Sequence, residues 1–519
     1  MIRIKNIKTE IKENIDIYEL ASKKLKVSKE RIKKVIIHKK AIDARSKHIF
    51  SYVFDLDVQI DNENSFLKEN IIKVENEEYV MPFMGNETLN KRPIVIGAGP
   101  SGLFCTFFLA KNGYKPVLFE RGEKIEQRVK TVEDLWQNNN FVSNSNVQFG
   151  EGGAGTFSDG KLNTLVKDKA GRMREVFKIF VECGAPEEIM YDSKPHIGTD
   201  ILRKVVINLR EKIISMGGEI HYNSCMEDII VENNKIKSVI VSGKCIDTDV
   251  LVLAIGHSAR DTFKMLNNKK IYMEAKPFAV GIRIIHPQKM INENQYPINY
   301  PFLPSASYKL TYKSKSGRGV YSFCMCPGGY VVNSRSTIDG ICINGMSNYK
   351  RDSRFANSAI VVTVSPDDYG NNPLDGIDFQ ENLEQKAYNI GNGAIPIQKY
   401  VDYKNNILSE SIDIDAFKGK TSLANINDIF PEYLNESLKE GIDYFNNKIN
   451  GFNGDVSVIA APEARTSSPV RIVRDEDFNS SVKGIYPCGE GAGYAGGITT
   501  SAMDGIKVFE SIYKRYKNK

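Results

Sequence analysis

The chain has 519 residues, of which 41% are hydrophobic and 26% are charged, and its formal net charge is +6. This length allows two or three domains with a large core, and the composition is ordinary for a soluble globular protein. The small net charge neither requires nor excludes a nucleic-acid partner. The first residues, MIRIKNIKTEIKE, lack the apolar core of a signal peptide, and eight cysteines are scattered along the chain. We therefore expect a cytoplasmic protein whose cysteines are mostly reduced thiols.

Residues 1–92 are expected to form a small basic α+β domain. The pattern predicts a short strand, a basic helical region, a second strand over residues 48–58 and a polar linker over residues 61–92. Residues 23–47 hold eleven Lys or Arg against two acids. Such a face could bind nucleic acid or an acidic redox partner, but it contains no aromatic residues for base stacking. A solvated helix face is therefore the favoured interpretation.

Residues 93–122 read PIVIGAGPSGLFCTFFLAKNGYKPVLFERG, which indicates a strand, a glycine turn, a helix and a second strand. Gly97, Gly99 and Gly102 form G-x-G-x-x-G. In this pattern the first glycine permits a tight turn, the second lets a pyrophosphate approach the backbone, and the third lets helix and strand pack closely. The helix N-terminus attracts phosphates, and Glu120 is expected to accept hydrogen bonds from a ribose diol. The segment predicts a dinucleotide-binding unit and no membrane span, because the glycines break its apolar run.

A second glycine-rich segment, at residues 146–161, reads NVQFGEGGAGTFSDGK. Its glycines permit close backbone approach to a flat ring. Polar residues that can address the heteroatoms of such a ring are interleaved, namely Gln148, Glu151, Thr156, Ser158, Asp159 and Lys161. In disulfide reductases the corresponding region carries a redox pair of cysteines, but here no cysteine lies between Cys105 and Cys183. That chemistry is therefore excluded at this position.

Residues 93–275 are expected to form the first part of the nucleotide-binding domain. The pattern predicts a helix over residues 200–215, then short strands separated by turns, then an apolar strand over residues 250–255. The last strand leads to Gly256 and His257 and is typical of the return strand of a FAD domain. His257 is a candidate catalytic residue beside the cofactor, although a simple turn residue is the favoured alternative.

Residues 276–455 are rich in aromatic residues, glycine and asparagine, and are expected to form a β-rich substrate or cap domain. Cys324 and Cys326 form a C-x-C motif, which could be a redox pair, a metal half-site or a pair of buried small residues. No second C-x-C or histidine partner lies nearby, so no metal site is predicted. Core packing is favoured over redox chemistry. The polar loop at residues 344–357 could line a pocket or the surface.

Residues 456–519 are expected to return to the nucleotide-binding domain through a strand at residues 484–487, a glycine-rich turn and a terminal helix. The strand runs into Gly489 and Glu490, and the helix opens near Gly496 and Gly497, as in two-domain flavoproteins. There an acid, here Glu490 in place of the usual Asp, reaches the ribityl or pyrophosphate region. The helix N-terminus faces the pyrimidine edge of the flavin and stabilises its negative charge on reduction.

Two arginines, Arg465 and Arg471, flank a Thr-Ser-Ser-Pro turn just before the chain returns to the flavin. Guanidinium forks bind oxyanions bidentately, so both are candidate catalytic residues that hold a carboxylate or phosphate of the substrate. Equally, they could pair with Glu463 or Asp475, or contact the phosphates of FAD. The sequence leaves these alternatives open.

Seven segments that span nearly the whole chain resemble a bacterial family of uncharacterised FAD-dependent dehydrogenases, within the glutathione-reductase and phenol-hydroxylase-like flavoprotein fold. They are IVIGAGPSGL, NVQFGEGGAGTFSDGKL, KPFAVGIRIIHP, YSFCMCPGGYVV, INGMSNYKRDSRFANSAIVV, EARTSSPVRIVR and GEGAGYAGGITTSAMDG. The resemblance implies FAD and an oxidoreductase but not the reaction, and it favours the loop at residues 344–357 as a pocket wall. The R-x-E-H-P of the family reads R-I-I-H-P here, so Ile285 replaces an acid.

The expected fold class is α/β, with a Rossmann-like FAD-binding domain, an inserted β-rich α+β substrate domain and the small N-terminal domain. No second G-x-G-x-x-G follows a strand, so NAD(P)H is expected only as a transient electron donor. FAD is expected to bind non-covalently. The residues expected to bind it are Gly97, Gly99, Pro100, Ser101, Gly102, Glu120, Arg121, Gly152, Gly153, Ala154, Thr156, Ser158, Gly160, Lys161, Gly256, Gly489, Glu490, Gly496, Gly497, Ile498 and Thr499.

The predicted function is a FAD-dependent oxidoreductase that transfers a hydride between flavin N5 and a small, anionic organic substrate. One alternative is a flavin-dependent hydroxylase that uses O₂, which the same fold also hosts. An alternative from a different class is a flavoprotein recruited to RNA or to an acidic protein partner by its basic N-terminal domain. Of these partners, a redox partner protein is favoured over nucleic acid.

Overall fold

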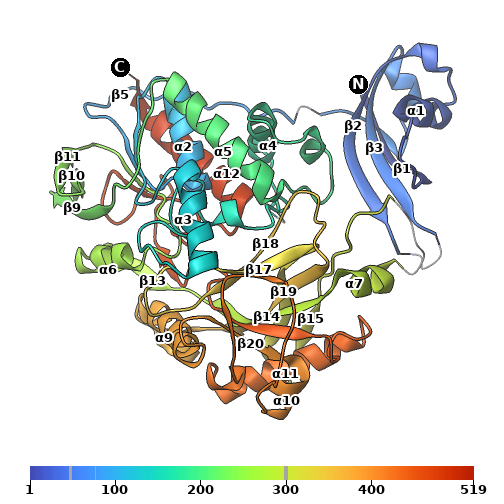
Figure 1. The fold of residues 1–519 in the computed structure, drawn as a ribbon. Helices are drawn as coiled ribbons and strands as arrows, with labels where there is room; N and C mark the ends of the chain where they lie inside the picture. Colours follow the sequence, from blue (N-terminus) through green and yellow to red (C-terminus); the bar gives the residue numbers. More distant parts are fainter. Residues whose placement is uncertain (46–48, 76, 165, 297–301, 519) are drawn as a thin grey trace.

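The computed structural model describes residues 1–45, 49–75, 77–164, 166–296 and 302–518. Three parts can be followed in Figure 1: a blue N-terminal sheet that stands to one side, a helix-rich part that contains both α2 and α12, and a part built around β14 and β19. No helix of the described residues is long and apolar enough to cross a membrane.

The N-terminal part is an antiparallel sheet with strand order β2-β3-β1-β4. Its elements are β1 (Ile2–Glu10), α1 (Ile17–Leu25), β2 (Ile32–Asp43), β3 (Ser51–Ile60) and β4 (Ile71–Lys73). One face of β3 is buried at every second residue, because successive side chains of a strand point to opposite faces. α1 buries Ala21 and Leu25 in the same core.

The predicted basic helical region is wrong over most of its length. α1 ends at Leu25, and of the basic residues that follow, Lys33, Lys34, Lys39 and Lys40 lie on β2. The reason is the β-branched run at residues 35–37, which pairs with β3 and fits a pleated strand better than a helix. Residues 46–48, which include the expected start of the second strand, lie outside the described residues.

The second part contains a five-stranded parallel sheet with strand order β25-β12-β6-β7-β8. Its strands are β6 (Ile94–Ile96), β7 (Val117–Phe119), β8 (Glu219–His221), β12 (Leu251–Leu253) and β25 (Ile485–Pro487). Its larger helices are α2 (Pro100–Lys111), α3 (Ile125–Asn138), α4 (Arg172–Glu182), α5 (Gly198–Ser215) and α12 (Ile498–Arg515). The predicted Rossmann-like fold is confirmed.

Helices α2 and α12 cross closely beside this sheet. A Cβ at Gly505 of α12 would lie 2.2 Å from the backbone oxygen of Ser101 in α2, so only glycine fits there. This crossing sets the N-termini of the two helices near each other, although they are nearly 400 residues apart in the chain. Smaller elements complete this part: β9 (Met226–Glu232), β10 (Lys235–Val241), β11 (Lys244–Asp247), α6 (Arg260–Asn268), β13 (Met273–Ala275), β24 (Val470–Ile472), β5 (Glu87–Thr88) and β26 (Tyr516–Lys517).

The third part, which we call the cap, is a seven-stranded sheet with strand order β15-β16-β19-β14-β23-β20-β22. The strands are β14 (Phe278–Pro287), β15 (Thr311–Lys313), β16 (Gly319–Cys326), β19 (Phe355–Val364), β20 (Ile395–Lys399), β22 (Thr421–Leu423) and β23 (Val458–Glu463). A smaller sheet joins β17 (Gly329–Asn333), β18 (Ile343–Ser347) and β21 (Phe417–Lys418). The helices are α7 (Gln288–Gln295), α8 (Pro366–Tyr369), α9 (Asp375–Ile390), α10 (Tyr400–Asn405) and α11 (Glu432–Asn446).

The cap extends further along the chain than the expected boundary at residue 455. Strand β23 begins at Val458 and pairs with both β14 and β20, so it belongs to the cap sheet rather than to the returning nucleotide-binding segment. The chain leaves the cap only after Glu463. The last cap strand is therefore followed directly in the chain by the segment that returns to the nucleotide-binding part.

Candidate functional site

A cavity of about 510 Å³ lies where the carboxyl ends of the parallel strands meet the cap. This volume is in the range of small-molecule and cofactor sites. The nucleotide-binding side contributes the glycine turn after β6 and the residues that follow β7 and β12, and the cap contributes residues of β16, β18 and β23. Ligands of open α/β sheets bind at this end of the strands.

The glycines after β6 have the geometry that the motif predicts. Gly97 has φ +101°, and a Cβ there would lie 2.3 Å from the backbone oxygen of Ala254. A Cβ at Gly102 would lie 1.9 Å from the oxygen of Gly97, so the helix can pack this closely only without a side chain. At Gly99 the nearest heavy atom, Cα of Gly153, would be 4.0 Å away. Gly99 lines the cavity and is the N-cap of α2 without a side-chain cap, which leaves N–H groups for a phosphate.

Glu120, at the end of β7, ties three turns together. One carboxylate oxygen accepts from the backbone N–H of Ala98 at 2.7 Å, and the other accepts from Gly122 at 2.9 Å and from Gly150 at 3.0 Å. The side chain is buried and lines the cavity. A carboxylate has about four acceptor positions, so one position remains for a ribose hydroxyl.

The glycine segment at residues 146–161 is held by a buried arginine that the sequence analysis missed. Arg128 of α3 is fully buried, and burial lowers its pKa to about 10. Its guanidinium donates to the backbone carbonyls of Asn146, Val147, Gly150, Glu151 and Gly153. These contacts fix an irregular backbone against the cavity. Nothing local in the sequence marks Arg128, because its partners are carbonyls 18 to 25 residues away.

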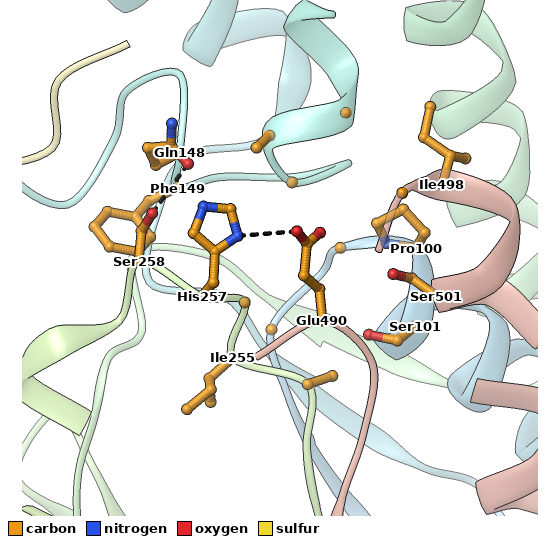
Figure 2. Close-up of a pocket in the computed structure, with 18 of the residues that line it drawn as sticks. Pro100, Ser101, Gln148, Phe149, Ile255, His257, Ser258, Glu490, Ile498 and Ser501 are labelled. Carbon is orange, nitrogen blue, oxygen red and sulfur yellow. Dashed lines mark hydrogen bonds and ion pairs between the residues drawn. The ribbon is translucent and has the colours of Figure 1, made fainter. Parts of the chain in front are cut away.

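His257 and Glu490 meet in the middle of the cavity wall. Figure 2 shows the Glu490 carboxylate pointing toward the imidazole, and Nδ1 of His257 lies 3.3 Å from Oε1 of Glu490. The other ring nitrogen, Nε2, is buried and has no hydrogen-bond partner within the described part of the chain. A buried polar atom without a partner commonly awaits a ligand or water. His257 therefore lies in the cavity wall beside Glu490, where the sequence had favoured a turn residue.

The turn after β25 opens toward the same cavity. A Cβ at Gly496 or at Gly497 would meet no heavy atom within 4 Å. Gly497 is the N-cap of α12 and no side chain caps it. Two uncapped helix N-termini, those of α2 and α12, therefore line one cavity, and both offer free N–H groups and partial positive charge.

Arg465 lines the cavity, but its guanidinium fork is already occupied. Nε and Nη2 donate to the two oxygens of Glu384, each at 2.6 Å, and Nη1 donates to Ser258 at 2.9 Å. Glu384 also accepts hydrogen bonds from both terminal nitrogens of Arg260, at 2.8 and 2.9 Å. The arrangement is a buried triad of one carboxylate and two guanidiniums. It argues against the expectation that Arg465 binds a substrate anion bidentately.

Arg471, the second candidate arginine, is not part of the cavity wall. It lies on β24, and its guanidinium carbon is 5.3 Å from the ring centroid of Tyr494. Pairing of these arginines with Glu463 or Asp475, an alternative that the sequence left open, is also not observed among the described residues. Glu463 pairs with Arg283 at 2.9 Å, and Asp475 accepts from the backbone N–H of Asn479 at 2.8 Å. Sequence proximity had suggested a shared role that the geometry does not support.

Most residues that the sequence assigned to the cofactor line the cavity. They are Gly97, Gly99, Pro100, Ser101, Glu120, Arg121, Gly153, Ala154, Ser158, Gly160, Lys161, Gly256, Glu490, Gly496, Gly497 and Ile498. The remaining five lie behind the wall, namely Gly102, Gly152, Thr156, Gly489 and Thr499. Thr499, for example, donates to the carbonyl of Leu162 at 2.7 Å and anchors the start of α12.

Other lining residues were not assigned to the site by the sequence analysis. They include Phe149, Ser258 and Phe323, whereas Cys324 and Ser467 belong to motifs that the sequence had singled out. Phe149 and Ser258 adjoin assigned residues, so adjacency could have found them. Phe323 and Cys324 lie on β16, and only the packing of the cap against the nucleotide-binding part brings them to the cavity.

Comparison with known families gives three matches along the chain. Residues 277–466 match the family described as FAD-dependent protein, C-terminal domain-like. Residues 95–157 match the NAD(P)-binding Rossmann-like domain, and residues 1–59 match a domain of unknown function. The first match coincides with the cap and the second with the glycine turns.

A protein of Clostridium beijerinckii, described as uncharacterized, is 44% identical to this chain over 529 residues, which cover 99% of each protein. Among solved structures, L-proline dehydrogenase from P. horikoshii has a TM-score of 0.36 and 12% identity, with coverage of 83% of this chain and 94% of its own. Glycine oxidase from Bacillus cereus has a TM-score of 0.33 and 11% identity, with coverage of 83% and 99%. Similarity at this level does not identify the function of this chain.

The residues of the cavity fit FAD. Two uncapped helix N-termini suit a pyrophosphate and a reduced flavin, and open space at Gly99, Gly496 and Gly497 admits the cofactor. Nε2 of His257 has no partner among the residues that the structure describes. The protein is a FAD-dependent oxidoreductase. The chain belongs to the same family as the clostridial protein, the bacterial FAD-dependent family that its motifs resemble.

Proposed function

We propose that this oxidoreductase transfers a hydride between the flavin of FAD and a small polar organic molecule bound against the cap wall. Bound FAD supplies a two-electron carrier that accepts or donates a hydride. The observation that carries the proposal is that the two uncapped helix N-termini and the polar cap wall line one continuous cavity. Cofactor and substrate can thus share one site.

The residues of the nucleotide-binding side would hold and orient the cofactor. The N-terminus of α2 and the glycine turn would face the pyrophosphate, and Glu120 would accept from the adenosine ribose. The N-terminus of α12 would stabilise negative charge at the pyrimidine edge of the reduced ring. Nε2 of His257, whose Nδ1 lies beside Glu490, would hydrogen-bond a polar atom in the cavity.

The cap side would hold the substrate. Asn344 and Ser467 bring an amide and a hydroxyl to the wall, which suits a polar molecule. The guanidinium fork of Arg465 is engaged by Glu384. We therefore propose a small polar substrate, and its binding does not require an arginine that holds an anionic group.

The test begins with a glycine on the cavity wall. Gly99→Val places a side chain where the pyrophosphate would lie, yet its backbone is extended and no atom blocks a Cβ. We expect this variant to fold and to purify without FAD. Gly319→Val is the matched control, because a Cβ there meets only Thr363 at 3.6 Å, away from the cavity. Stoichiometric FAD in Gly99→Val would contradict the placement of the cofactor.

Substrate exchange is then tested on the wild-type holoenzyme. Anaerobic addition of NADH and of NADPH identifies the electron donor through bleaching of the flavin absorbance, and a panel of small polar oxidants is screened for reoxidation. Rapid reoxidation by O₂ with incorporation of oxygen into a substrate would instead support a hydroxylase.

A further inference from the structure

The C-x-C motif lies at a distorted end of β16. The pairing of β16 with β19 shifts register between Phe323 and Cys326, so the strand bulges between them. Cys324 has φ +43°, a conformation that residues other than glycine rarely adopt. The bulge re-aims the side chains, and Cys324 lines the cavity together with Phe323. Non-glycine residues in such conformations cluster at functional sites.

The second cysteine is folded back toward the first. The sulfur of Cys326 lies 3.2 Å from the backbone oxygen of Cys324, to which the thiol donates a hydrogen bond. Both cysteines are free thiols, and Cys326 is fully buried behind Cys324. One thiol is therefore exposed to the cavity and the other is screened, within reach of its neighbour. This is the arrangement of an attacking thiol and a resolving thiol.

Two cations face this pair from different elements. Nζ of Lys161, in the glycine segment, donates to the carbonyl of Met325, and Nη1 of Arg283, on β14, donates to the carbonyl of Cys324 at 3.3 Å. Nη1 of Arg283 also lies 3.9 Å from the sulfur of Cys326. Cations beside a thiol favour the thiolate, which is the reactive form.

The charges and hydrogen bonds around the pair separate the two thiols chemically. The hydrogen bond from Cys326, together with Lys161 and Arg283, lowers the pKa of Cys324 to about 5 although burial opposes this. The hydrogen bond to Cys324 and burial raise the pKa of Cys326 well above its ordinary value. The nearby carboxylates, Asp159 and Glu463, act in the opposite sense on Cys324. These opposite shifts favour the thiolate at Cys324 and the thiol at Cys326.

We propose that Cys324 and Cys326 form a redox-active dithiol–disulfide couple that exchanges two electrons with FAD in this cavity. This inference rests on the proposed flavin site. In the oxidising direction the thiolate and the thiol lose two electrons and one proton and form one sulfur–sulfur bond. Oxidised FAD takes up those two electrons and that proton, so charge and hydrogen balance. In the reverse direction reduced FAD returns them and the disulfide opens.

The position of the couple differs from the redox cysteines of disulfide reductases. There the pair lies in the region that corresponds to residues 146–161, where this chain has no cysteine. Here the pair comes from the cap and faces the cavity from the substrate side. Electrons would therefore pass between the flavin and the cap wall, where a small disulfide or thiol can reach Cys324.

The first experiment is a reductive titration of the holoenzyme under anaerobic conditions, after mild oxidation with a small disulfide reagent. We expect wild type to take up four electrons per flavin, and Cys324→Ser/Cys326→Ser to take up two. Cys342→Ser is the matched control: Cys342 is also buried in the cap, but it is not part of the cavity wall, and burial raises its pKa to about 11. Two-electron uptake by wild type, or the same loss in Cys342→Ser, would overturn the proposal.

The second experiment needs no variant and no flavin signal. Alkylation of wild type before and after oxidation, followed by peptide mass mapping, should show Cys324 and Cys326 protected together and joined by a disulfide. Alkylation of Cys324 in the reduced protein should remain fast at pH 6. Slow alkylation at pH 6, or no disulfide, would refute the couple even where FAD is bound. Failure to bind FAD would instead refute the proposed function and leave the disulfide result to stand alone.

Discussion

The two walls of the cavity are built from different materials. The nucleotide-binding wall consists of glycine turns, free backbone N–H groups and polar side chains such as Glu120, which accepts from three backbone groups. The cap wall consists of side chains that are held by buried ion pairs, such as Arg283 with Glu463 and Arg465 with Glu384. One wall is suited to a fixed, common cofactor, and the other wall can vary with the substrate.

The walls also differ in how far apart their determinants lie in the sequence. The glycine turn, α2 and Glu120 fall within thirty residues. In the buried triad, Glu384 of α9 in the cap is 124 residues from Arg260 of α6 and 81 residues from Arg465. The two walls are joined, because Arg465 donates to Ser258 and Ser258 donates to Gln148 of the glycine segment. The buried triad of Glu384, Arg260 and Arg465 thus supports both walls of the cavity.

The largest effect on stability is expected from breaking the buried triad of Glu384, Arg260 and Arg465. Glu384→Gln leaves Arg260 and Arg465 buried without a compensating charge, which should lower the free energy of unfolding by about 3–5 kcal/mol. Denaturant unfolding of the apoprotein measures this. Glu381→Gln is the control on the same helix: Glu381 is partly exposed and 3.6 Å from Arg260, so its loss should cost about 1 kcal/mol or less. Equal effects would show that the triad contributes no more than a surface pair.

The triad also predicts how this difference depends on pH. Burial alone would raise the pKa of the Glu384 carboxyl, but Arg260 and Arg465 outweigh it and lower the pKa to about 2. A depressed folded-state pKa contributes stability that is present above the ordinary value of 4.5 and is lost as the pH falls toward 2. The gap between wild type and Glu384→Gln should therefore be largest near neutral pH and shrink in acid. A gap that widens between pH 5 and pH 3 would contradict this.

An intermediate effect is expected on the nucleotide-binding wall. Glu120→Ala removes the acceptor for three backbone N–H groups and for the adenosine ribose, and should weaken FAD binding by about 1.5–3 kcal/mol, or roughly 10–150-fold in Kd. Fluorescence titration of the apoprotein with FAD measures this. Glu436→Ala, at an exposed position of α11, serves as the control. Unchanged affinity in Glu120→Ala would mean that other groups hold the ribose.

The contrast between the walls explains what the sequence could predict. Residues 93–122 contain every determinant of their own turn, so the strand, the helix and the positions of Gly97, Gly99 and Gly102 followed from local pattern. The role of Arg465 did not, because its partner Glu384 lies on another element. The prediction of a basic helical region was wrong for a similar reason. Its β-branched residues form a strand only because β3 pairs with them. Cys324 was noticed as a motif, but its exposure to the cavity depends on the bulge of β16.

The smallest effect is expected from substitution of Arg471. This substitution tests whether substrate binding needs a second guanidinium. Arg471 stacks on Tyr494 outside the cavity wall, and a lysine can keep much of that contact, so Arg471→Lys should change stability by less than about 1 kcal/mol. FAD affinity and the rate of flavin reduction should stay within about twofold of wild type. Arg465→Lys provides the comparison, because it breaks the fork to Glu384 and should lose stability. A tenfold loss of turnover in Arg471→Lys, with FAD retained, would restore the anion-binding hypothesis and place the substrate beside β24.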